Sequence, residues 1–247
     1  MRIEIVAISK LFVANLRYNK IALVFNLVFP TVYYLYNYYS GGIDAQNMTQ
    51  QVVYFWTYII FVSILNFMIL PMITYRESGI YKQLWLIVSR KNAIMLALFL
   101  VYMTVIALEL IIFNLAVMVT SGAWQPELLI SSLLTLILFG PISYMILTLL
   151  LVLKIVPESL SVLAAILIFI LFYLVTLDST NVGLQMLYML NPVKYLLVAS
   201  TWMLGLITGQ GFDGLVALQL VVVGVVMCAI GVFSLKNFNV KPLINQM

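Results

Sequence analysis

Long apolar stretches separated by short polar connections run through the whole chain. A stretch of about 18 or more apolar residues can cross the hydrocarbon core of a membrane as a helix. The pattern predicts six such spans, each ended by charged or turn-forming residues. Their expected limits are residues 21–39, 52–74, 92–120, 128–153, 160–177 and 215–235. We therefore expect an all-α polytopic membrane protein that forms a single transmembrane domain over residues 1–247.

Two further segments have helical patterns but are not expected to cross. Residues 1–18 carry an apolar stripe at helical spacing, made of Ile5, Ile8, Phe12 and Leu16. This stripe favours an amphipathic helix at the membrane surface over a frayed tail. Within residues 178–213, Asn191–Pro192 separates two apolar halves that are each short for a span, and the residue before a proline avoids the helical conformation. We expect a re-entrant pair of helices on the outer face.

The basic residues orient these spans. Six spans place both chain ends on one face, where eleven of the twelve Lys and Arg residues then fall. These are Arg2, Lys10, Arg17, Lys20, Arg76, Lys82, Arg90, Lys91, Lys154, Lys236 and Lys241. Only Lys194 falls on the opposite face. Because cytoplasmic loops carry an excess of Lys and Arg, we expect a cell-membrane protein with both termini in the cytoplasm.

Composition narrows the chemistry. The chain is 65% hydrophobic and 8% charged, has a net charge of +4, and contains no histidine. The missing histidine excludes Ser-His catalysis and histidine-ligated zinc or haem. The basic residues lie between apolar spans, which argues against a nucleic-acid partner and for membrane lipid. No G-x-x-x-x-G-K-[ST] phosphate loop is present. We expect neither enzyme activity nor a cofactor or metal bound by this chain.

The connection between the second and third spans carries the most specific pattern. Residues 75–91 read as a short charged helix at the cytoplasmic surface, with apolar residues (Ile80, Leu84, Trp85) that suit a partner's groove. The run resembles the R-E-x-G-x-x-K-x-L run of the permease subunits of ABC-2 type exporters. The matching residues are Arg76, Glu77, Gly79, Lys82 and Leu84. Asn191–Pro192, the span pattern and the N-terminal helix extend the resemblance over nearly the whole chain.

This resemblance implies partners. In the ABC-2 family the run is a coupling helix seated in a cleft of a separate cytoplasmic ATP-binding-cassette subunit, which binds ATP and Mg²⁺. The resemblance also implies a second copy of the permease, or a sister permease, and it fits a bacterial protein. The connection at Pro157 and Glu158 is a second candidate contact with the ATPase subunit, with a tight turn as the equal alternative. For residues 75–91 the alternative is an ordinary positive-inside loop.

Glu109 is the carboxylate expected well inside a span. A charge buried in lipid is costly and usually faces the protein interior or a water-filled cavity. Glu109 therefore either belongs to a substrate path or carries a proton. The structural alternative is a protonated Glu109 bonded to a neighbour such as Asn114, Tyr102 or Thr104.

An aromatic series in the first span is a further candidate for the path. Phe25, Phe29 and Tyr33 recur at helical spacing, and such a wall would suit an amphipathic cargo. Aromatic belts at the ends of spans are the stronger interpretation.

The cargo is inferred from the same features. Few charges in the spans suit a hydrophobic or amphipathic substrate. Short ABC-2 chains with this span pattern look similar to bacterial exporters of amphipathic peptides, such as bacteriocins or phenol-soluble modulins, so peptide export is our expectation. Exporters of drugs, lipid-linked glycans or teichoic acids are near alternatives. An ion-coupled secondary transporter, which often shows inverted repeats, and an intramembrane lipid enzyme are more distant ones.

Overall fold

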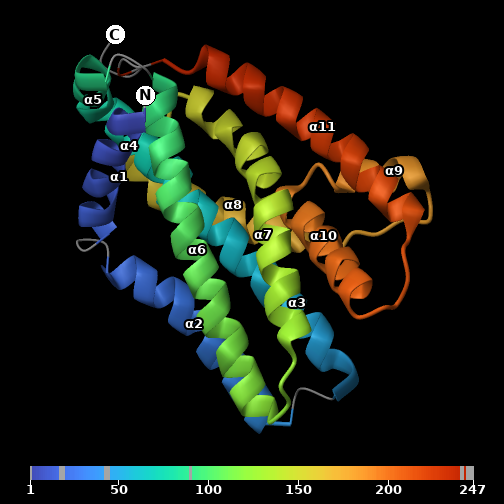
Figure 1. Cartoon of the computed structure of the whole chain (residues 1–247). Coiled ribbons are helices and arrows are strands. Elements are labelled where there is room, and N and C mark those ends of the chain that lie inside the picture. Colours follow the sequence, from blue (N-terminus) through green and yellow to red (C-terminus); the bar gives the residue numbers. More distant parts are fainter. Residues whose placement is uncertain (1, 17–19, 42–44, 89–90, 240–241, 243–247) are drawn as a thin grey trace.

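The computed structural model describes residues 2–16, 20–41, 45–88, 91–239 and 242. Every regular element in this part of the chain is a helix (Figure 1). In order, these are α1 (Arg2–Leu16), α2 (Lys20–Tyr39), α3 (Ala45–Ser63), η1 (Ile64–Ile69), α4 (Leu70–Glu77), α5 (Ile80–Val88), α6 (Lys91–Ser121), α7 (Pro126–Leu147), η2 (Thr148–Val152), η3 (Pro157–Ser159), α8 (Leu160–Leu174), α9 (Val182–Tyr188), α10 (Pro192–Ile207) and α11 (Gly214–Asn237). Residues 1, 17, 18, 89 and 90 of the segments singled out above lie outside the described residues.

Several of these helices are long and apolar enough to cross a membrane, which confirms a helical multi-pass membrane protein. Among the described residues five stretches qualify: Met48–Glu77, Ala93–Ser121, Pro126–Val152, Pro157–Leu174 and Gly214–Asn237. They coincide with five of the six expected spans. The expected first span, residues 21–39, forms helix α2 but is not among them. The count of six spans is therefore not confirmed.

The segment around Asn191 is bent, as its sequence predicts. Helix α9 ends at Tyr188 and α10 begins at Pro192, and the two axes differ by 113°. The Asn191 side chain caps α10 by accepting a hydrogen bond from the Val193 backbone N–H at 2.9 Å, which satisfies one of the unpaired donors of the first turn. Such a pair is either one broken span or a re-entrant loop.

The helix connections gather at two ends of the bundle. Helices α6 and α7 run side by side in opposite directions, and α5, the start of α6 and the end of α11 lie at the same end (Figure 1). We call this the basic end, because it holds Arg76, Lys82, Lys154 and Lys236. The connection between α6 and α7, around Trp124, lies at the opposite end. The basic end is therefore built from segments far apart in sequence.

The stretch α3–η1–α4 is the central helix of the bundle, and most of its membrane-length window is buried. Within this stretch, η1 is a π-helix in which the Leu70 N–H donates to the Leu65 carbonyl. This wider turn begins directly after Ser63. Single π turns inside α-helices often lie at functional sites. Helix α8 is mostly exposed by comparison and lies at the periphery.

The remaining helices are held in place by close contacts with their neighbours. Helix α11 packs against α7 and η2, and a Cβ placed on Gly231 would lie 2.6 Å from the Met145 Cβ. Small residues allow helix backbones in membranes to approach in this way. Helix α1 packs along α6, with Ile8 and Phe12 of its apolar stripe buried. The placement of α1 at a membrane surface stays a prediction.

Candidate functional site

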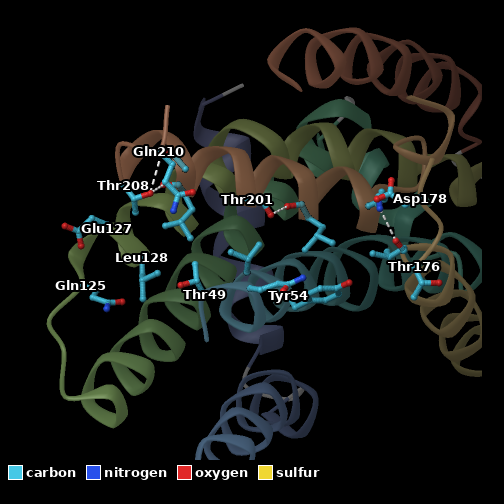
Figure 2. A pocket seen from close by; sticks show the side chains of 17 residues that line it. Thr49, Tyr54, Gln125, Glu127, Leu128, Thr176, Asp178, Thr201, Thr208 and Gln210 are labelled. Carbon is cyan, nitrogen blue, oxygen red and sulfur yellow. Dashed lines mark hydrogen bonds between the residues drawn. The ribbon is translucent and has the colours of Figure 1, made fainter. Parts of the chain in front are cut away.

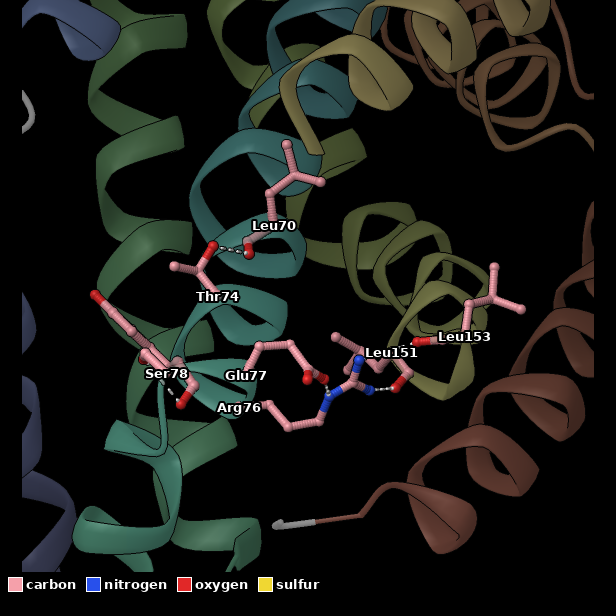
Figure 3. Close-up of polar contacts among 8 residues, drawn as sticks. Leu70, Thr74, Arg76, Glu77, Ser78, Leu151 and Leu153 are labelled. Atoms are coloured by element: carbon pink, nitrogen blue, oxygen red, sulfur yellow. Dashed lines mark hydrogen bonds and ion pairs between the residues drawn. The ribbon is translucent and has the colours of Figure 1, made fainter. Parts of the chain in front are cut away.

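Arg76 lies at the end of α4 with none of its side chain exposed. Its Nε donates to Glu77 Oε1 at 2.5 Å, and its two terminal nitrogens donate to the carbonyl oxygens of Leu151 and Leu153 (Figure 3). The bond to Leu153 measures 2.9 Å. The guanidinium carbon also lies 6.0 Å from the centre of the Phe238 ring, within cation–π range. One side chain therefore contacts the ends of three membrane-length helices.

This arrangement differs from a charged helix displayed to solvent. Arg76 is fully buried and Glu77 is 8% exposed, so both point into the chain. A planar guanidinium with several fixed donors suits this task, because it can join a carboxylate and two carbonyls at once. The pair holds the end of α4 against the connection that follows η2. The bonds to Leu151 and Leu153 therefore join the end of α4 directly to the end of η2.

Gly79 forms the corner between α4 and α5. Its backbone has φ = 77°, which glycine adopts readily and other residues rarely do. The Gly79 N–H donates to the Arg76 carbonyl at 3.1 Å, closing the end of α4. The corner turns the chain so that α5 lies across the basic end.

Helix α5 presents two different faces. Tyr81, Leu84 and Val88 are buried at helical spacing, and burial raises the pKa of the Tyr81 hydroxyl, so it stays neutral. Lys82 is exposed. The exposed face carries Lys82 and Gln83 together with apolar side chains, of which Ile87 is 80% exposed. Of the apolar residues expected to meet a partner, Ile80 and Trp85 are on this exposed face and Leu84 is not.

The second connection lies beside the first. Pro157 and Glu158 form the short helix η3, which packs against α4. Glu158 is exposed and Pro157 is partly buried. The two segments singled out as partner contacts, far apart in sequence, therefore share one surface at the basic end, with the Arg76 bonds between them.

Glu109 is buried in the interior of the bundle, 4% exposed. Its Oε2 accepts a hydrogen bond from the Ser63 hydroxyl at 2.7 Å, and Ser63 in turn accepts one from the Asn26 amide at 2.5 Å. Within the described part of the chain, Glu109 Oε1 has no hydrogen-bond partner. The three residues join α2, α3 and α6, one of them directly before the π turn.

Glu109 is bonded to a neighbour, Ser63, but not to Asn114, Tyr102 or Thr104, the examples named for the structural alternative. Thr104 donates to the Leu100 carbonyl of its own helix, and Asn114 belongs to a second polar chain. The Trp56 indole donates to Asn114 Oδ1 at 2.8 Å, and the Asn114 amide donates to the Ser132 hydroxyl at 2.8 Å. This chain joins α3, α6 and α7. Sequence reasoning missed Ser63, Trp56 and Ser132, because single polar residues in apolar spans carry no pairing signal.

The aromatic series on α2 is separate from Glu109. Phe25 stacks on Phe29 with ring centres 5.7 Å apart, and Phe29 stacks on Tyr33 at 6.1 Å. All three side chains are 43–64% exposed on the outside of α2, whereas Asn26 on the same helix is buried. The four residues expected along a path therefore do not meet around one cavity.

A cavity of about 800 Å³ lies on the side of the bundle away from the basic end (Figure 2). Helix α3 supplies one wall through Thr49, Val53 and Tyr54, and α10 supplies another through residues that include Thr201 and Leu204. Glu127 and Asp178 lie at its two ends in Figure 2. Its size is typical of a ligand site, and its lining mixes apolar, amide and hydroxyl groups.

Lys194 also lines this cavity, and its ammonium group is bonded to backbone carbonyls. The Lys194 ammonium donates to the carbonyls of Val175 and Leu177 at 3.1 and 3.2 Å. These carbonyls follow the end of α8, where the helix leaves acceptors unpaired. The one basic residue expected on the outer face therefore anchors α10 to the end of α8.

No protein-family model, curated protein or solved structure matches the chain. Among the described residues no group of three or more His, Cys, Asp or Glu side chains is placed to hold a metal ion. The basic end, the buried polar chains and the cavity are the features of the described residues that bear on function.

Proposed function

We propose that the chain is the membrane-spanning permease subunit of an ATP-driven exporter. In this proposal it spans a bacterial cell membrane six times with both termini in the cytoplasm, α1 lies at the inner surface, and α9 and α10 form an outer re-entrant pair. Hydrolysis of ATP with Mg²⁺ takes place on a separate ATP-binding-cassette subunit. A second permease copy or a sister permease completes the path. The chain itself carries out no covalent chemistry.

The observation that carries the proposal is the corner between α4 and α5. The exposed apolar side chains of α5 suit the cleft of a partner, and the buried Arg76 joins this corner to the end of η2. A push on α5 would therefore reach α3–η1–α4 and α7 together. A ligand can shift a conformational equilibrium only by binding one state better than the other, and the corner would pass such a preference of the partner from α5 to α4.

The cavity opposite the basic end suits an amphipathic cargo, because its apolar walls are interrupted by amides, hydroxyls and two carboxylates. We propose a peptide as the substrate class. A drug, a lipid-linked glycan or teichoic acid would use the same mixed lining.

A second candidate, an ion-coupled secondary transporter, is favoured by one observation. Glu109 is a buried intramembrane carboxyl with one oxygen that lacks a partner in the described part of the chain. Intramembrane carboxyl groups commonly serve in proton relays. Uptake or release of an amphipathic peptide by liposomes that contain this chain alone, driven by a pH gradient and abolished by Glu109→Gln, would favour this candidate over ATP-driven export.

The proposal is tested by purifying the tagged chain from native membranes and identifying the proteins that accompany it. We expect a polypeptide with a phosphate loop, and ATPase activity that rises when amphipathic peptides are added. Ile87→Asp, on the exposed face of α5, should reduce recovery of that polypeptide at least ten-fold. Trp124→Asp is the matched control, because Trp124 is 77% exposed at the opposite end and Ile87 is 80% exposed. Equal recovery with both variants, or no phosphate-loop protein with the wild type, would refute the proposal.

A further inference from the structure

An apolar groove of about 620 Å³ opens between α6, α7 and α11. It is distinct from the mixed cavity near Glu127, with which it shares no lining residue. Residues that line it include Met95, Phe99, Pro141, Met145, Val232 and Lys236. Apart from Lys236 and the Tyr144 hydroxyl, its lining side chains are apolar.

The groove lies at a defined level along the long axis of the bundle. Met95 lies in the second turn of α6, and Val232 and Lys236 lie in the last turns of α11, which ends at Asn237. All three positions are close to the basic end. The groove therefore occupies the half of the bundle nearest that end, with Lys236 at its rim and apolar side chains deeper in.

This order of groups matches a phospholipid. An acyl chain fills apolar surface inside the hydrocarbon layer, and the phosphate lies at the level where a lysine near a helix end extends its ammonium. Juxtamembrane basic residues attract anionic headgroups. A second copy of the chain fits less well, because a two-fold symmetric contact brings the same surfaces together and would place one Lys236 near another. A cationic peptide would meet the same repulsion.

We propose that this groove is a binding site for an anionic phospholipid, with one acyl chain between α6 and α11 and the headgroup at Lys236. The proposal needs only the membrane location of the chain, so it stands or falls separately from ATP-driven export. A lipid held there would cover Pro141 of α7 and the close contact at Gly231. It would thereby join the three helices near the basic end.

The experiment uses the full chain, purified in detergent and incubated with an equimolar mixture of phosphatidylglycerol and phosphatidylcholine. Native mass spectrometry then counts the lipids that remain bound. We expect the wild type to retain one phosphatidylglycerol in preference to phosphatidylcholine. Lys236→Gln should lower that preference about five-fold, the usual effect of one lysine near an anionic surface. Lys154→Gln is the control, because Lys154 is an exposed lysine of the same end that does not line the groove.

A second pair of variants tests the acyl-chain part of the site. Val232→Trp fills the groove and should abolish retention of the lipid. Val225→Trp adds the same bulk to α11 seven residues earlier, at a position that is 65% exposed and outside the groove, and should leave retention unchanged. Far-UV circular dichroism verifies that each variant keeps its helix content. Equal retention by the two tryptophan variants, or an unchanged lipid preference in Lys236→Gln, would overturn the proposal.

Discussion

The pair Arg76–Glu77 offers the most direct test of how the basic end is held together. Its two side chains are 0% and 3% exposed, so solvent screens their attraction little. Replacing Arg76 by Met removes a guanidinium bonded to Glu77 and to two backbone carbonyls. Breaking a buried ion pair by removing one partner typically costs about 3–5 kcal/mol. We expect Arg76→Met to lower the free energy of unfolding by that amount.

Companion variants distinguish the energetic contribution of the ion pair from that of the other contacts of Arg76. Glu77→Gln leaves Arg76 its two carbonyl acceptors and the Phe238 ring, so we expect a smaller loss of about 2 kcal/mol. The double variant should lose less than the sum of the single losses, by roughly 1–2 kcal/mol, because residues in direct contact couple. Lys154→Met removes an exposed charge from the same end and should change stability by less than about 0.5 kcal/mol.

The assay is equilibrium unfolding in mixed detergent micelles, followed by far-UV circular dichroism. Labelling of Cys228, the only cysteine of the chain, supplies a second probe on α11. A loss below about 1 kcal/mol for Arg76→Met, or strict additivity in the double variant, would refute the role assigned to this pair. Either result would favour the alternative that residues 75–91 are an ordinary basic loop.

Two further predictions concern packing inside the bundle. Gly231→Ala should cost about 1–3 kcal/mol, because the added Cβ would lie 2.7 Å from the Met145 carbonyl oxygen; Gly205→Ala, whose Cβ would meet nothing nearer than 3.8 Å, should be neutral or stabilising in the same unfolding assay. Tyr144→Phe should be neutral or stabilising, because its buried hydroxyl has no hydrogen-bond partner among the described residues. Tyr195→Phe, which removes a 3.2 Å bond to a backbone carbonyl, should cost about 1 kcal/mol. Equal effects within either pair would contradict these packing arguments.

The spans could be predicted from sequence because the hydrophobic pattern is long and nearly uncharged. The bend at Asn191 could also be predicted, since an Asn–Pro pair imposes a local backbone preference. The first span, residues 21–39, was predicted from the same pattern and forms helix α2. Local chemistry therefore fixed where most helices begin and end.

The contacts between helices could not be predicted from the sequence in the same way. Arg76 reads as a surface cation, and only the fold shows that η2 ends beside it. Ser63 reads as one small residue in an apolar run, although it joins Asn26 to Glu109. A polar residue in a span needs a hydrogen-bond partner, but the position of that partner depends on how the helices rotate and pack. The groove at Lys236 likewise depends on three helices that the sequence alone does not bring together.

The π turn of η1 has a consequence for how the central helix tolerates changes in length. A turn closed by a bond from residue i+5 to residue i contains one residue more than an α-helical turn. Deleting one residue between Ile64 and Ile69 would convert it to a regular turn and leave Ser63 and Arg76 in nearly their present orientations. A deletion earlier in α3 would instead rotate one part of the helix against the other by about 100°. Length variants should therefore accumulate at this turn and be rare on either side of it.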